Sequence, residues 1–226
     1  MKRSILQLAL LLALSAFAAS AQESEYATIE CTGEATVAAV PDIITFELAR
    51  TVRAASIYDA ATTLETMDEA IAEALGARTL EPSEAIASGI AVPDANLPEA
   101  VRTARIQFRL DPLKPSAERL GVASSLCDAM REIATSLECV LKGPKFSVQN
   151  EKEHVQAAIL KAAENAYIAG EGAATSLTTQ IIGVSKLKVD AILWDFDREW
   201  RALPSDVDRV TCKVKVTVQY QHGFTQ

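Results

Sequence analysis

The chain has 226 residues, of which 49% are hydrophobic and 23% are charged, and this composition excludes a disordered tail and a small disulfide scaffold. The formal net charge of −8 and the lack of any run of Lys and Arg argue against a nucleic-acid-binding surface. Two histidines and an aromatic content of 5% leave few metal ligands and general bases.

The first residues have the pattern of a secretory signal peptide. Lys2 and Arg3 precede an apolar stretch, and the small residues 19–21 follow it. The stretch is shorter than the roughly 20 residues that a membrane-spanning helix needs. We therefore expect residues 1–21 to be removed, so that a mature chain of residues 22–226 begins at Gln22. Its 20 basic and 30 acidic residues give a net charge of about −10.

Two strands are predicted next. Residues 29–39 alternate between apolar and polar side chains, as in a half-buried strand. Pro41 and Asp42 interrupt the pattern, and the alternation resumes from Ile44 to Arg53. We expect the two strands to pair as a hairpin.

The middle of the chain predicts two helices separated by two strands. Ser56 and Asp59 resemble a capping box before apolar residues at helical spacing over 57–75, and Gly76 suits the end of that helix. Residues 85–92 and 103–110 read as strands. Pro115 opens a second helix, whose apolar face includes Cys127.

The last third predicts a strand over 138–148, a helix starting near Asn150, and strands over 183–193 and 210–220. The third helix carries small residues in steps of four, which would let its backbone lie close to a sheet or a neighbouring helix. They are Ala158, Ala162, Ala166, Gly170 and Ala174. This order predicts an α+β fold, with a mixed or antiparallel sheet of about six to eight strands and three helices packed on it.

The motifs of common enzymes are absent from the sequence: it has no GxSxG, P-loop, GxGxxG or HExxH pattern. His154 is expected at a solvated helix terminus and His222 in a polar tail. Four acidic residues lack the glycine-punctuated spacing of a calcium loop and are expected to form a surface turn. They are Asp190, Asp195, Asp197 and Glu199. We expect no catalytic, cofactor-binding or metal site and no cofactor.

The order of elements and several short motifs resemble the SIMPL domain family of bacterial envelope proteins, once catalogued only as a domain of unknown function. The opening strand contains Gly33 and is followed by the Pro41-Asp42 pair. A late helix with alanine at every fourth residue leads to Gly183-Val184 at the start of a strand. Family members often have a second glycine in the opening strand, where this chain has Ala35, and Gly183 falls about one place late. The resemblance covers residues 27–220.

This resemblance implies a non-catalytic protein of the cell envelope, either periplasmic or associated peripherally with the outer membrane. Some members of the family assemble into large rings, and some are linked to protection against oxidative stress. We therefore expect a homo-oligomer with no nucleic-acid partner and no transmembrane helix in the mature chain. The alternative is a periplasmic binding module that holds a small ligand or a damaged envelope polypeptide in a groove between helices and sheet.

The cysteines are the remaining candidates for a chemical role. Export permits disulfides, and four cysteines allow three sets of pairs. The resemblance places the first and last strands in the same region of sheet, which makes Cys31 and Cys212 one candidate pair. Cys127 and Cys139 are twelve residues apart across the end of a helix, so a reversing turn could bring them within bonding range. Buried free thiols are the other interpretation.

Overall fold

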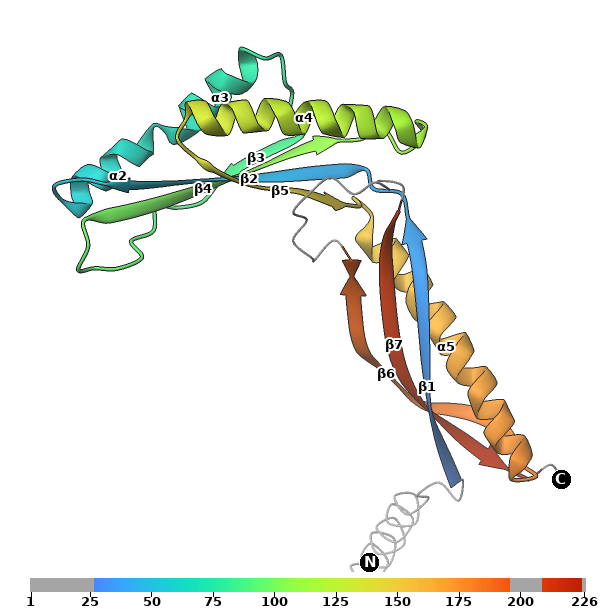
Figure 1. Cartoon of the computed structure of the whole chain (residues 1–226). Coiled ribbons are helices and arrows are strands. Elements are labelled where there is room, and N and C mark those ends of the chain that lie inside the picture. Colours follow the sequence, from blue (N-terminus) through green and yellow to red (C-terminus); the bar gives the residue numbers. More distant parts are fainter. Residues whose placement is uncertain (1–26, 196–208, 225–226) are drawn as a thin grey trace, which may run out of the picture. The chain divides into compact units, whose positions relative to one another are not determined.

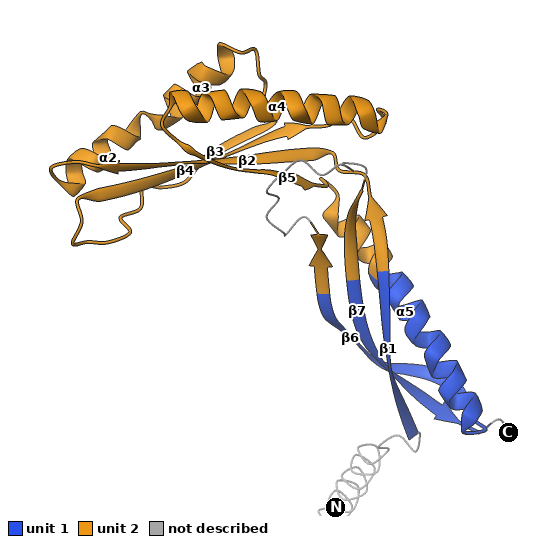
Figure 2. Ribbon diagram, viewed as in Figure 1, with its two compact units in different colours: residues 1–35, 159–191, 214–226 blue, residues 36–158, 192–213 orange. Residues whose placement is uncertain are grey.

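The computed structural model describes residues 27–195 and 209–224, and the predicted signal peptide lies outside them. The described residues contain seven strands in two antiparallel sheets together with helices, so the α+β class is confirmed. Two compact units divide the chain, as Figure 2 shows. Unit 1 comprises Met1–Ala35, Ile159–Ala191 and Val214–Gln226, and unit 2 comprises Thr36–Ala158 and Ile192–Lys213.

The larger sheet belongs to unit 2 and has the strand order β3-β4-β2-β5. Its strands are β2 (Ile43–Arg53), β3 (Glu84–Ala87), β4 (Glu99–Arg109) and β5 (Val140–Ser147). In the register of β2 and β4, Ile44 lies opposite Phe108 and Leu48 opposite Ala104, and all four side chains are buried. β3 is shorter than the predicted strand over 85–92, because only one isolated bridge, Ala91 to Val101, continues its pairing.

Three helices lie on the same side of this sheet in Figure 1: α2 (Ile57–Glu65), α3 (Met67–Gly76) and α4 (Ser116–Ser136). The predicted cap of α2 is confirmed, because the Ser56 hydroxyl accepts a hydrogen bond from the Asp59 amide at 3.1 Å. The single helix predicted over 57–75 is divided at Thr66 into α2 and α3. Leu64 at the end of α2 and Met67 at the start of α3 both remain buried, so the division preserves the apolar face.

The second sheet has the order β1-β7-β6, formed by β1 (Ala27–Ala39), β6 (Gln180–Trp194) and β7 (Val210–Gly223). The predicted hairpin is therefore wrong, since β1 and β2 lie in different sheets. Both edges of β2 are occupied, by β4 and by β5, and no edge remains for β1. The prediction that the first and last strands share a sheet is confirmed, because β1 and β7 are neighbours.

Asp42, between β1 and β2, accounts for the Pro-Asp motif. Its carboxylate accepts a hydrogen bond from the Gln149 amide at 2.8 Å. Its backbone bonds Leu110 beyond β4 and Ser147 in β5. The residue therefore fixes the entry of β2 between its two neighbours and the turn that precedes α5 (Glu151–Ser176).

Within unit 1, α5 lies directly on β1 through its small residues, as their spacing predicts. A Cβ built on Gly33 would stand 2.0 Å from the Ala162 carbonyl oxygen and 2.6 Å from the Ala166 nitrogen. Only glycine allows so close an approach of helix and strand. Ala162 and Ala166 are fully buried, and Gly170 lies against the ring of Tyr220 in β7.

Candidate functional site

The four cysteines are free thiols in the structure. In unit 1, Gln219 donates a hydrogen bond to Glu30, and Lys215 is paired with Glu34. These contacts define an antiparallel register that places Cys31 opposite Val218. Cys212 comes six residues earlier in β7, so a bond between Cys31 and Cys212 requires another register. The pairing stays a prediction, to be decided by non-reducing peptide mapping.

Cys127 lies on the buried face of α4, as predicted, and is 7% exposed. Cys139 follows the helix and is half-buried, with its Sγ atom 3.5 Å from the Leu137 carbonyl oxygen. The pairing of these two cysteines also stays a prediction, and the same mapping tests it.

The thiols share one electrostatic property. Burial raises the pKa of Cys127 to about 11, with a smaller contribution from Asp128. Burial is also the main cause of the raised pKa of Cys31, Cys139 and Cys212. Arg50 opposes the shift at Cys139. Because the thiolate is the reactive form, these environments disfavour a nucleophilic or peroxide-reactive thiol near neutral pH.

Each described histidine has a structural contact. The His154 ring meets Trp194 edge-on at 6.4 Å between centroids, and His222 Nδ1 lies 3.0 Å from the Thr179 hydroxyl. Neither contact places the ring beside a carboxylate that could orient it as a general base.

Asp190 and Asp195, two of the four acidic residues considered for a cation site, each accept a hydrogen bond from a threonine of β7. The Thr217 hydroxyl donates a hydrogen bond to Asp190, and that bond, with a smaller contribution from Lys188, lowers the pKa of the Asp190 carboxyl. The Thr211 hydroxyl donates to Asp195. Asp197 and Glu199 lie outside the described residues. Within the described ranges, no three side chains of the His, Cys, Asp and Glu types come together to hold a metal ion.

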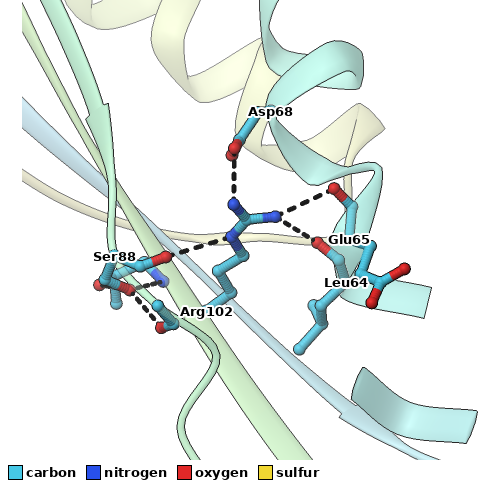
Figure 3. A network of polar contacts seen from close by, with 7 residues as sticks. Leu64, Glu65, Asp68, Ser88 and Arg102 are labelled. Atoms are coloured by element: carbon cyan, nitrogen blue, oxygen red, sulfur yellow. Dashed lines mark hydrogen bonds and ion pairs between the residues drawn. The ribbon is translucent and has the colours of Figure 1, made fainter. Parts of the chain in front are cut away.

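Arg102 lies at the centre of a cluster of polar contacts in unit 2 (Figure 3). The strand predicted over 103–110 did not include this residue, which belongs to β4. The guanidinium donates to the carbonyl oxygens of Leu64 and Glu65 at 2.8 and 3.0 Å and to that of Ser88 at 3.2 Å. It also contacts Asp68 at 2.6 Å. Arg102 thus holds the junction of α2 and α3 against β4. Extending the alternation of β4 backwards from Ile106 and Ala104 would have placed Arg102 on the buried face.

An apolar cleft of about 430 Å³ adjoins this cluster, between α3 and the strands β3 and β4. Ile71 and Leu75 line it from the helix, and Ala85, Ala87 and Ala104 line it from the sheet. Asp68 also lines the cleft, and it is the aspartate that binds Arg102. The cleft lies between a helix and a sheet, which is the arrangement expected for a small-molecule groove.

Strand β6 carries the second region of interest, which we call the β6 surface: the exposed apolar side chains Ile182 and Val184 on one face of the strand and Leu187 and Val189 on the other. These side chains are between 37% and 60% exposed. Among the described residues, β6 pairs with β7 on one side only, so its other edge is open. A long apolar edge strand of this kind is unusual in an isolated monomer.

No helix within residues 27–195 and 209–224 combines the length and apolar character that a membrane crossing requires. The structure defines a class of α+β protein in which helices cover two separate antiparallel sheets and one sheet ends in an exposed apolar strand.

The model of the SIMPL family, described as a protein of unknown function (DUF541), matches residues 29–220. The chain belongs to this family, and the resemblance seen in its motifs is confirmed. No curated protein matches the chain.

Proposed function

We propose that the mature chain is a non-catalytic, exported protein of the cell envelope that self-associates through the β6 surface. The observation that carries this proposal is the exposure of the four apolar side chains on the open edge of β6. The signal-peptide pattern of residues 1–21 supports export to the periplasm or its outer-membrane boundary.

The other strand edges favour β6 as the point of association. β3 has four residues, and β5 contains Pro144 opposite a register shift in its pairing with β2. β1 alternates Glu and Thr on its polar face. Short edges, prolines and charges are the usual ways of preventing strand pairing. β6 has fifteen residues and no proline, and its two lysines, Lys186 and Lys188, lie in the middle of the strand, where Lys188 is paired with Asp190.

A second copy of the chain is the partner that suits this edge. Strand addition would satisfy the open backbone donors and acceptors and would place side chains of the second copy beside the exposed apolar ones. A closed symmetric assembly would leave no unpaired edge. The raised pKa of each thiol supports a structural role over a redox-catalytic one, so any link to oxidative stress would act through envelope assembly.

Light scattering of the purified mature protein at micromolar concentration tests the proposal. We expect an oligomer in the native chain and a monomer in the double variant Val184→Lys with Val189→Lys, because lysines on an edge strand block its pairing. Val122→Lys on α4 is the matched control, since Val122 is a similarly exposed valine on a helix of unit 2. It should leave the oligomer unchanged.

A native chain that is monomeric at these concentrations would contradict self-association. An oligomer that survives both lysines would contradict the assignment to β6.

Fractionation and mass spectrometry test export separately. We expect a periplasmic or outer-membrane fraction and a mature amino terminus at Gln22. Residues 1–21 intact on the exported protein would contradict the processing step.

A further inference from the structure

The cleft beside α3 exists because its floor is made of small residues. In the pairing of β3 with β4, Ala87 lies opposite Ala104 and Ala85 opposite Ile106. Three of these four residues are alanines, which do not reach the helix above them. Ile71 and Leu75 cover the floor from α3 and are each 4% exposed. The volume of about 430 Å³ lies within the roughly 300–1,000 Å³ range of small-molecule sites.

The cleft has one charged end. Ala104 is followed on the same face of β4 by Arg102, whose guanidinium contacts Asp68 on α3. Four contacts occupy the guanidinium: three backbone carbonyls and the Asp68 carboxylate. Its side chain is 15% exposed, whereas that of Asp68 is 48% exposed. The group that remains accessible at this end is therefore the carboxylate.

The helix that covers the cleft is also negatively charged. Asp68, Glu69 and Glu73 lie on α3, and residues 54–77 contain neither Lys nor Arg. An anionic ligand would meet a carboxylate and an arginine with four of its five N–H groups already bonded, while a cation would meet a partly exposed partner for an ion pair.

We infer that the cleft binds a small apolar molecule that carries a cationic amine, with its apolar part on the alanine floor and its amine at Asp68. This site is distinct from the β6 surface and does not depend on self-association. The apolar contacts supply the affinity, and the carboxylate selects for the charge.

Three probes with the same chain test the charge: octylammonium, 1-octanol and octanoate. Isothermal titration of the purified mature protein should show the tightest binding for octylammonium, with octanoate about tenfold weaker or more and 1-octanol between them. Ligand-dependent shifts in melting temperature should follow the same order.

The variant Asp68→Asn removes the charge at the end of the cleft, and the preference of octylammonium over 1-octanol should disappear. Glu69→Gln is the matched control, because it removes the same charge from the next residue on α3, which does not line the cleft. It should keep the preference.

The variants Ala87→Leu and Ala85→Leu fill the cleft from its edge strand and should weaken all three probes at least tenfold. Both positions lie outside the buried core, so the fold should survive the added volume. Ala117→Leu, at an exposed position on α4, is the control for the substitution itself.

Binding of octanoate as tight as that of octylammonium would overturn the charge assignment. Binding that is unchanged by both leucine variants, or no measurable binding of any probe, would overturn the site.

Discussion

β6 and β7 are neighbouring strands that are rich in apolar residues, yet they have opposite exposure. β7 buries Val214, Val216 and Val218 to 1% exposure or less, whereas Val184 and Leu187 in β6 are 60% and 46% exposed. β7 has a paired strand on each side, and β6 has one on a single side among the described residues. The difference shows that burial depends on the position of a strand in the sheet as well as on its composition.

The largest expected effect comes from Gly33, which lies in β1 on the same face as the buried residues of β7. Gly33→Ala places a methyl group against the backbone of α5, so helix and sheet must separate. We expect a loss of about 3 kcal/mol or more in the free energy of unfolding, measured by urea titration. Gly172→Ala, on α5 with no atom within 4 Å of the added Cβ, should stabilise by roughly 0.5–1 kcal/mol. Equal effects of the two changes would refute the close packing of β1 on α5.

The comparison of the strands is sharpened by making the same substitution in each. Val216→Ala in β7 should lower the free energy of unfolding by about 2 kcal/mol through lost burial and a residual cavity. Val184→Ala in β6 should change it by about 0.5 kcal/mol or less at protein concentrations where the chain is monomeric. Urea titrations at several concentrations measure both. A large loss from Val184→Ala in the monomer would mean that β6 is covered within its own chain.

The smallest expected effect concerns Cys212, which is fully buried in β7. Burial, followed by the charge of Glu151, raises the pKa of its thiol above the ordinary value of 9.0. A raised folded-state pKa stabilises the fold below the unfolded-state value and loses that contribution as pH rises, because the unfolded thiol gives up its proton first. The free energy of unfolding should therefore fall more steeply above about pH 9 in the native chain than in Cys212→Ala. Parallel pH profiles would place the thiol in contact with solvent.

Sequence patterns predicted a helix or strand well where its structure depends on residues that are close together in the chain. The alternation of β7, the capping of α2 by Ser56 and the small residues of α5 are confirmed. The α+β class follows from the order of these elements. The small residues at every fourth position of α5 also indicated that its backbone would lie close to a sheet or a neighbouring helix, and it lies against β1.

The candidate sites were harder to predict, because their residues come from distant parts of the chain. Arg102 lies 34 residues from Asp68 and was missed when the strand over 103–110 began too late. The alternation of the chain continued to Arg102, so a longer window would have placed it on the inner face. The cleft depends on Ala87 and Ala104 facing each other, which only the register of β3 and β4 decides.

The sequence by itself determined the order of the elements, the apolar side of most of them, and membership in the family, but not the division of the first helix at Thr66 or the short length of β3. The tertiary structure alone decided that β1 pairs with β7 and not with β2, and that β6 ends its sheet with apolar side chains exposed. The physical reason is that periodicity is set by backbone geometry within a few residues. Strand pairing, in contrast, is a competition for edges among segments far apart in the chain. β4 and β5 occupy both edges of β2, and that outcome leaves β1 for β7 and β6 with an open edge.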